Sequence, residues 1–467
     1  MCTVAPAMVR RLLSSPRAPL VLLAVVSVLS LAARAAWLGE PCQSPCNTAS
    51  DHVLVFDEAY YVNAARVIAG LRPPAGAHYA DAPSGTDPNA EHPQGTKLVM
   101  AGAIELFGDG PFAWRIGSLI FGSLAILGLY ALVRAAGGGP WVALAASTLM
   151  ACDNLLLVHG RIGTLDIYVL APMIWAVALY LRGRPILAGL LLAVATCFKE
   201  VAPYALLALA LLEVFRLAAA RGDPRSPPDW ALKPALVRFG ACAAIAAVGF
   251  VVLLGVMDRI ATPYADSSAT LITGGPFAHI AHMISYAANL TSPNGPKGIA
   301  SYPWQWLFDY KPITYLRIGA SNPHDEFHAI HPVSRFFGMM SPPIMLLAIP
   351  ALLFAAYRIA VIARGRLQTP DGSPVPNQVA ILGLAWFIGT FLPYELQSLL
   401  DSRTSYIYYM VIVMPGIYVS ISYMLACAVR WRPAAVWRHT AVWGLTAVWA
   451  LGVLVAVVLM YPFTPLF

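Results

Sequence analysis

The carboxylates best placed for chemistry in this sequence are Asp57 and Glu58, which stand side by side in the stretch Phe56-Asp57-Glu58-Ala59-Tyr60-Tyr61. A carboxylate can act as a general base that takes a proton from a hydroxyl group, a contribution of about 10²–10⁴-fold in rate. Asp57 begins a segment with helical spacing, so Glu58 should point to a different face and position the loop or a substrate. We take Asp57 as the candidate base and Glu58 as its companion in a catalytic acidic pair.

A second group of residues has the chemistry that binds phosphate: Lys97, Arg115, Arg161 and Arg403. Arginine binds phosphate in bidentate geometry and lysine binds it as a point charge. All four residues fall near the ends of apolar or amphipathic segments. The alternative role for each is an anchor whose charged head extends to the membrane surface. The sequence leaves both roles open, and the phosphate role is the hypothesis we carry forward.

Two further residues are candidates for supporting roles. His92 lies in Glu91-His92-Pro93-Gln94-Gly95-Thr96-Lys97 and can orient Asp57 or a phosphate group, although a loop histidine is more often solvated. Asp166 follows Arg161 by five residues, so we expect it to pair with Arg161 or a neighbouring cation. Lys199 and Glu200 separate two short apolar segments, where they can form an internal ion pair or contact the same phosphate.

The composition says what must hold these residues in place. Hydrophobic residues make up 59% of the 467 residues and charged residues 11%, which is typical of a protein that crosses a membrane many times. The hydrocarbon core is about 30 Å thick and needs roughly 20 apolar residues per helix. Eleven segments qualify as candidate spans: 19–38, 113–133, 140–158, 163–181, 185–198, 201–215, 236–257, 337–357, 377–393, 405–427 and 440–461.

Two features of this list leave alternatives open. The segments 185–198 and 201–215 are short and can form a re-entrant hairpin, which would leave every later loop on the same side. The first segment follows a basic start and ends near small residues, as a cleaved signal peptide would. We favour an uncleaved first span because the run is long for a signal peptide. The prediction is therefore an all-α membrane domain over 1–467 with about eleven spans.

Basic residues predict the orientation, because cytoplasmic loops carry an excess of Lys and Arg. With the N-terminus in the cytoplasm, that side holds 17 of the 30 basic residues and 4 of the 23 acidic ones. Loops 39–112, 259–335 and 394–404 are then outside. We expect a multi-pass protein of the cell membrane with its active site outside the cytoplasm. The net charge of +7 reports this orientation and does not indicate nucleic-acid binding.

The first outer loop, 39–112, has ordered elements at both ends. Residues 57–69 and 97–107 have helical spacing with an apolar face and are expected to lie in the membrane interface. Residues 72–92 are rich in Pro, Gly, Asp and Ala and indicate coil. Cys42 and Cys46 lie where disulfides persist, and the sequence does not decide whether they are bridged. In the second outer loop, 259–335, a helix is expected over 276–290.

Ordered motifs along the chain carry a resemblance to a known family. The Asp57-Glu58 pair, His92-Pro93 and Lys97 are followed by Phe112-Ala113-Trp114-Arg115-Ile116, then Asp153-Asn154 with His159-Gly160-Arg161 through Asp166. Further on stand His282-Met283-Ile284-Ser285-Tyr286, Ser301-Tyr302-Pro303-Trp304-Gln305-Trp306-Leu307 with Lys311-Pro312, and Ser402-Arg403-Thr404-Ser405-Tyr406-Ile407-Tyr408-Tyr409. The set resembles the lipid-carrier-dependent glycosyltransferases of the GT-C class, and within it the protein O-mannosyltransferase family.

The resemblance implies a GT-C bundle that moves a sugar, mannose in that family, from a polyprenyl or dolichyl phosphate to Ser or Thr hydroxyls of secreted or membrane proteins, with inversion. It places the base at Asp57 and implies no cofactor and no metal ion, the lipid-phosphate sugar being the donor substrate. The sequence has Gln94 where the family usually has a second proline after His-Pro. Loop 259–335 is too short for the luminal sugar-binding-like domain of the eukaryotic members, so the chain resembles the prokaryotic type.

Other functions remain open at this point. A transferase of the same class that modifies a glycolipid or a cell-wall glycan would need the same base and phosphate contacts, so the sequence does not separate it from a protein mannosyltransferase. A multi-span transporter usually places ionisable residues near mid-membrane in two repeated halves, and no such repeat is evident here. A metal site at His324, His328 and His331 is disfavoured because Pro323 and Pro332 interrupt the local helix.

Overall fold

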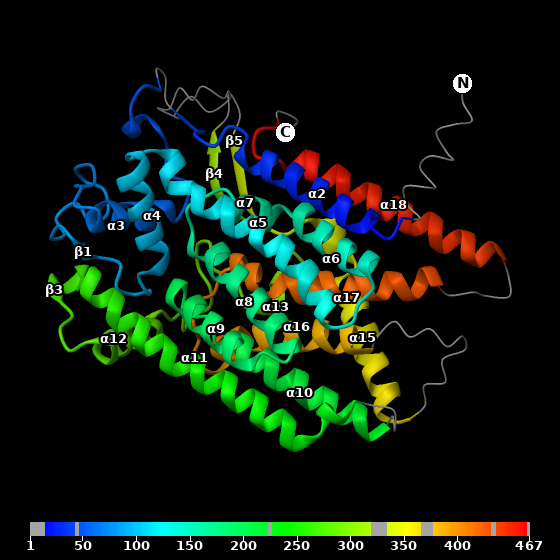
Figure 1. Ribbon diagram of the computed structural model, residues 1–467. Helices are drawn as coiled ribbons and strands as arrows, with labels where there is room; N and C mark the ends of the chain where they lie inside the picture. The colour runs from blue at the N-terminus through cyan, green and yellow to red at the C-terminus, as the bar shows by residue number, and fades with distance from the viewer. Residues whose placement is uncertain are drawn as a thin grey trace.

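The computed structural model describes residues 15–42, 46–222, 227–318, 334–365, 377–430 and 436–464. Long helices run side by side in a bundle, and shorter helices gather at one end of it (Figure 1). The helices are α2 (Ala18–Ala35), α3 (Glu58–Ile68), α4 (Gly95–Phe107), α5 (Pro111–Ala135), α6 (Pro140–Cys152), α7 (Asn154–His159), α8 (Leu165–Leu181), α9 (Pro185–Phe198), α10 (Tyr204–Gly222), α11 (Leu232–Ile260), α12 (Pro276–Asn289), α13 (Pro303–Trp306), α14 (Pro342–Leu346), α15 (Ala348–Ala363), α16 (Asn377–Leu400), α17 (Met410–Arg430) and α18 (Val436–Met460).

Each of the eleven predicted spans contains helix. Among the described residues, seven helical segments are long and apolar enough to cross a membrane: 18–35, 111–135, 232–260, 342–363, 378–400, 407–430 and 439–459. The predicted spans 140–158, 163–181 and 185–198 contain the shorter apolar helices α6, α8 and α9. The predicted span 201–215 became α10, which carries Glu213 in an ion pair with Arg216 at 3.1 Å. The protein is therefore a multi-pass helical membrane protein.

The bundle has buried helices at its centre and helices with exposed apolar side chains on its outside. Helix α17 is 78% buried over its apolar window, whereas the corresponding windows of α11 and α18 are 17% and 11% buried. A helix that is hydrophobic on all faces belongs either in a core or in a membrane. Figure 1 shows α2 and α18 along one side of the bundle and α10 and α11 along the opposite side. Because they leave apolar side chains exposed, these outer helices are suited to contact lipid.

Sequence features explain where several helices begin. Proline is the first residue of α5, α6, α9 and α12, a position where its missing N–H costs nothing and its fixed φ favours the helix. Helix α4 begins at Gly95. This position requires glycine, because a Cβ there would collide with the backbone carbonyl of Cys197 near the end of α9. This close approach brings the first outer loop against the turn between α9 and α10.

Short strands that the all-α prediction missed lie outside the long helices. β1 (Thr86–Asp87) pairs in parallel with β2 (Thr262–Ala265), which pairs antiparallel with β3 (Thr270–Leu271). β4 (Ile313–Ile318) and β5 (Ser334–Gly338) form an antiparallel pair. Strands this short contain too few residues for the alternation of apolar and polar side chains to be recognised in the sequence. The β1–β2 pair joins the first outer loop to the second.

The helices predicted in loops 39–112 and 259–335 are confirmed. Segments 57–69 and 97–107 correspond to α3 and α4, and segment 276–290 corresponds to α12. Cys42 and Cys46, left open by the sequence, form a disulfide with a Cα–Cα distance of 5.7 Å. His52 lies beside the bridge, with Nε2 3.9 Å from the sulfur of Cys42. His324, His328 and His331 lie outside the described residues.

Candidate active site

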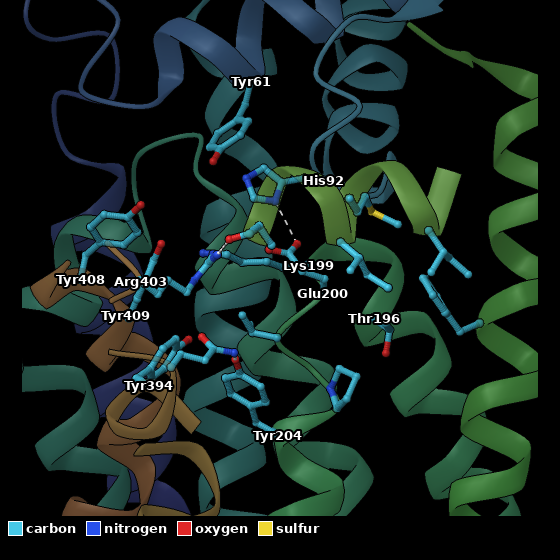
Figure 2. A pocket seen from close by; sticks show the side chains of 18 residues that line it. Tyr61, His92, Thr196, Lys199, Glu200, Tyr204, Tyr394, Arg403, Tyr408 and Tyr409 are labelled. Atoms are coloured by element: carbon cyan, nitrogen blue, oxygen red, sulfur yellow. Dashed lines mark hydrogen bonds and ion pairs between the residues drawn. The ribbon is translucent and has the colours of Figure 1, made fainter. Parts of the chain in front are cut away.

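Helices α3, α4 and α12 gather at one end of the bundle (Figure 1), and a cavity of about 420 Å³ opens there (Figure 2). One wall is apolar and comes from α11 and α12: Phe250, Ile280, Met283, Ile284 and Ala287. The opposite part is polar and comes from α3, the coil before α4, the α9–α10 turn, α10, α16 and the segment after α16: Tyr61, His92, Lys199, Glu200, Tyr204, Gln397, Arg403, Tyr408 and Tyr409. The cavity thus has both an apolar and a polar, basic part.

Asp57 is the residue immediately before α3, and it interacts with Lys199, His92 and Tyr408 of the polar part of this cavity. Burial and the negative charge of Asp166 raise the pKa of Asp57, which lies at about 7. The positive charge of Lys199 and a hydrogen bond with Tyr408 act in the opposite direction. A carboxylate with a pKa near neutrality is well suited to take up and release a proton.

Lys199 and Asp166 form a buried ion pair beside Asp57. The Nζ atom of Lys199 lies 2.6 Å from Oδ1 of Asp166, and both side chains are 5% exposed. The ammonium group also faces the rings of Tyr408 and Tyr409, at 5.5 and 5.1 Å from their centroids. We expected Asp166 to pair with Arg161 or a neighbouring cation, and the partner is Lys199 from the α9–α10 turn.

His92 reaches the same polar wall through Glu200. Its Nδ1 lies 2.9 Å from a carboxylate oxygen of Glu200, a contact drawn in Figure 2. Burial raises the pKa of Glu200, but the charge and hydrogen bond of His92 outweigh it and hold the pKa at about 2. Tyr61 of α3 packs against the imidazole, with ring centroids 6.1 Å apart. His92 is thus held by a residue more than one hundred positions later in the chain.

Glu58 points away from the cavity into a buried ion pair with Arg115. The carboxylate accepts hydrogen bonds from Nε and Nη2 of Arg115 at 2.8 and 2.7 Å and from the backbone N–H groups of Val55 and Gly163, both at 2.7 Å. Glu58 is 0% exposed and Arg115 2%. The pair joins α3, α5 and the turn before α8, so the geometry gives Glu58 a structural task.

The remaining donors of Arg115 are also occupied. Nη1 donates to the carbonyl oxygens of Leu38 and Glu40, and Nη2 donates to that of Val53 at 3.1 Å. A guanidinium group has five N–H donors, and five contacts to protein oxygens account for them. Arg115 therefore presents no spare donor to the cavity, and the predicted phosphate contact is not favoured by this geometry.

Lys97 is buried in a similar way near the start of α4. Its Nζ atom lies 2.6 Å from Oδ2 of Asp87, and both side chains are 0% exposed. The same ammonium group donates to the backbone carbonyls of Asn89 and His92. Lys97 thus holds the coil that carries His92. It does not line the cavity itself and affects it through the position of His92.

The other two predicted phosphate ligands differ from each other. Arg161 is 1% exposed, donates to the carbonyl oxygens of Ala36 and Trp37, and lies over the ring of Phe463 at 4.7 Å. Arg403 lines the cavity and donates to the carbonyl oxygen of Ala287 on α12. Of the four cations predicted to bind phosphate, Arg403 is the one whose side chain reaches the cavity wall.

Aromatic side chains pack around Phe56, the residue that precedes Asp57. Phe56 adopts a positive φ of 56° and stacks on Tyr315 of β4, with ring centroids 4.1 Å apart. The hydroxyl of Tyr315 lies 2.8 Å from Nε2 of His159. Phe56 also contacts Tyr408 edge to face at 5.4 Å. The sequence places Tyr315 in an aromatic segment of loop 259–335, where such residues are usually interfacial anchors and where the family resemblance suggests closure over the acceptor. It gives Tyr408 no role of its own.

The fold places the protein in a class. Over 96% of its residues it superposes on the protein O-mannosyltransferase Pmt1–Pmt2 complex of S. cerevisiae bound to the sugar donor, with a TM-score of 0.70, 12% identity and 90% of that chain covered. The archaeal oligosaccharyltransferase AglB from Archaeoglobus fulgidus, solved with an inhibitory peptide and a dolichol phosphate, matches with a TM-score of 0.52 and 13% identity over 96% of this chain and 56% of that one. The protein has the GT-C fold of membrane glycosyltransferases.

The sequence comparisons narrow this class. Residues 91–227 match the family described as dolichyl-phosphate-mannose-protein mannosyltransferase. A polyprenol-phosphate-mannose–protein mannosyltransferase of Corynebacterium glutamicum is 35% identical over 117 residues, which are 25% of this chain. The matched stretch spans 22% of that relative's length. The resemblance to the protein O-mannosyltransferase family thus has support from both sequence and fold.

Proposed function

We propose that this protein transfers mannose from a polyprenyl phosphate carrier to Ser or Thr hydroxyl groups of exported proteins. The observation that carries the proposal is Asp57, a carboxylate with a pKa of about 7 beside a cavity that has an apolar and a basic part. The matched family segment 91–227 includes His92, Lys199 and Glu200, which line that cavity. The fold it shares with a protein O-mannosyltransferase adds support.

The reaction follows from these groups. The hydroxyl oxygen of the acceptor attacks the anomeric carbon of the mannosyl donor, and the bond from that carbon to the phosphate oxygen breaks. Asp57 accepts the hydroxyl proton, and the polyprenyl phosphate leaves with the bonding electrons. Attack opposite the leaving group inverts the configuration at the anomeric carbon. The proton on Asp57 then passes to water.

The two parts of the cavity suit the two parts of the donor. Arg403 lies where a phosphate group can be bound by a guanidinium group. Lys199 lines the same part of the cavity, where its ammonium group is paired with Asp166. The apolar wall from α11 and α12 suits the prenyl chain. Arg115, Arg161 and Lys97 would then stabilise the surrounding loops rather than contact the phosphate.

We further propose that the protein lies in the cell membrane with its N-terminus in the cytoplasm. Loops 39–112 and 259–335 would then face outward with the cavity, where exported acceptors and the carrier head group meet. The distribution of basic residues supports this orientation. We expect transfer without any added metal ion or cofactor.

The direct test uses purified protein in lipid nanodiscs. Polyprenyl phosphate with radiolabelled mannose is mixed with Thr-containing peptides, and label on the peptide is measured in buffer with a chelator. The wild-type protein should label the peptide, and Asp57→Asn should lower turnover by roughly 10²-fold or more while donor binding persists. The exposed Asp81, changed to Asn, is the matched control and should keep full activity.

Cells provide the test against other functions. Mass spectrometry of surface proteins and lipids is compared with and without this chain. Loss of protein-linked hexose is the expected result. An altered glycolipid with unchanged proteins would instead identify a transferase of the same class with a lipid acceptor. Accumulation of an unmodified solute on one side of the membrane would indicate a transporter.

A further inference from the structure

The β4–β5 hairpin has two edges, and one of them is covered by the protein itself. The backbone N–H of Arg335 on β5 donates to the carbonyl oxygen of Pro462 at 2.7 Å. The carbonyl oxygen of Phe337, two residues further along β5, accepts a hydrogen bond from the Asn154 side chain at 2.9 Å. The C-terminal segment and α7 therefore occupy the outer edge of β5.

These contacts fix the direction of the backbone groups on β4. In an antiparallel pair, opposite residues either exchange both hydrogen bonds or both point away from each other. Arg335 and Phe337 point away from β4, and their partners across the ladder are Arg317 and Thr314. The N–H and C=O groups of Arg317 and Thr314 must therefore point to the other edge of the hairpin.

That second edge is open in the part of the chain that the structure describes. No backbone hydrogen bond connects Thr314 or Arg317 to a segment other than β5 there. Both side chains are exposed, while Ile313 and Ile318 are buried. A row of unpaired backbone groups is a template for another extended chain. It has no complementarity to a prenyl chain or to a sugar ring alone.

The open edge is connected to the candidate base. The strand register shifts between Thr314 and Leu316, as at a β-bulge, and Tyr315 has no partner across the ladder. A bulge redirects a side chain, and the ring of Tyr315 stacks on Phe56, the neighbour of Asp57. A peptide lying along β4 would thus pass beside the residue that holds Asp57 in place.

We propose that the acceptor polypeptide binds as a third strand on the free edge of β4, pairing with Arg317 and Thr314 and presenting its hydroxyl toward Asp57. This inference rests on the proposed function, because it assumes a polypeptide acceptor. Main-chain pairing at a sheet edge gives affinity with little demand on sequence, and alternate side chains of the added strand face the same side. The enzyme would therefore accept extended segments of varied composition.

The first test leaves the enzyme unchanged. An acceptor peptide with a single Thr is N-methylated at one backbone amide at a time, and KM for the peptide is measured in nanodiscs. Methylation should raise KM about 5–10-fold at every second position and have little effect between, because one of two successive N–H groups faces β4. A flat scan, or one without this alternation, overturns the proposal.

The second test changes the strand edge. Arg317→Pro removes one outward N–H while leaving the β4–β5 ladder intact, and Arg317→Ala removes the side chain alone. The proline variant should raise the acceptor KM about 5–10-fold with unchanged donor hydrolysis, and the alanine variant should stay within about twofold of wild type. Equal behaviour of the two variants, or a change of oligomeric state in place of KM, would count against a peptide on this edge.

The two proposals fail in different ways. If wild-type protein labels no peptide, the proposed function is wrong. If it labels peptides but neither the methylation scan nor Arg317→Pro shows the expected effect, only the edge-strand inference is wrong.

Discussion

The pH dependence of transfer provides the sharpest test of Asp57 as the base. Burial and the charge of Asp166 raise its pKa from 3.8 to about 7. A carboxyl group with a raised pKa is protonated, and inactive as a base, below that value. Activity should be present above pH 7 and be lost as the pH falls through it. With a pKa of about 7, roughly one eleventh of the base is ionised at pH 6 and about ten elevenths at pH 8, so kcat/KM should rise about tenfold over this interval.

Neighbouring charges allow the assignment to be checked without removing the base. Asp166→Asn removes a negative charge and should move the rising limb to lower pH, whereas Lys199→Met should move it to higher pH. A shift of roughly one pH unit is expected for each. His92→Gln controls for the nearby imidazole, and the limb should persist in that variant.

The assay is initial-rate transfer to a peptide between pH 5.5 and 8.5, with donor concentrations well below KM. Two results would refute the reasoning. One is a profile that is flat over this range. The other is a limb that moves in the same direction in Asp166→Asn and Lys199→Met, because opposite charges cannot act alike on one carboxylate.

Three further predictions concern the surroundings of the site. Arg115→Met and Glu58→Gln each leave a buried partner unpaired and should cost about 3–5 kcal/mol of stability, seen as a lower thermal midpoint in detergent; an unchanged midpoint contradicts the structural role. Arg403→Ala should raise the donor KM about tenfold. Arg403→Lys should raise it less, since lysine keeps the charge but cannot bind in bidentate geometry. Donor KM values equal to that of the wild type would leave Arg403 as an anchor of α12. In a background without free cysteines, an impermeant thiol reagent should label Ser84→Cys from outside the cell and miss Pro227→Cys, and labelling at 227 would reverse the proposed orientation.

The sequence was a good guide to the long helices, because about twenty apolar residues in a row have few alternative structures. It also located helices α3 and α4 from their apolar faces. The strands β1–β5 were missed because two to six residues carry little periodic signal. The pairing of Thr86 with Thr262 depends on distant segments, which no local pattern reveals.

At the site, the residue types indicated the chemistry of each side chain but did not predict which residues it contacts. Lys97, Arg115 and Arg403 were equivalent in the sequence as cations near the outer surface. The structure separates them, because Asp87 and Glu58 take up the first two in buried pairs while Arg403 reaches the cavity. Which carboxylate a cation meets is decided by tertiary packing, and Asp87 gave no sign in the sequence of being such a partner.

The residues that surround Asp57 are synthesised at widely separated times. Phe56 packs against Tyr408, about 350 residues later in the chain. At about 5–20 residues per second, roughly 20–70 s of translation separate them. During that time the loop that carries Asp57 has its contact with Arg115 available early but lacks Tyr315 and Tyr408. A nascent chain can therefore insert its first spans long before it can become active, and one truncated before β4 would lack both rings and expose Phe56 to the chaperones and proteases of the membrane surface.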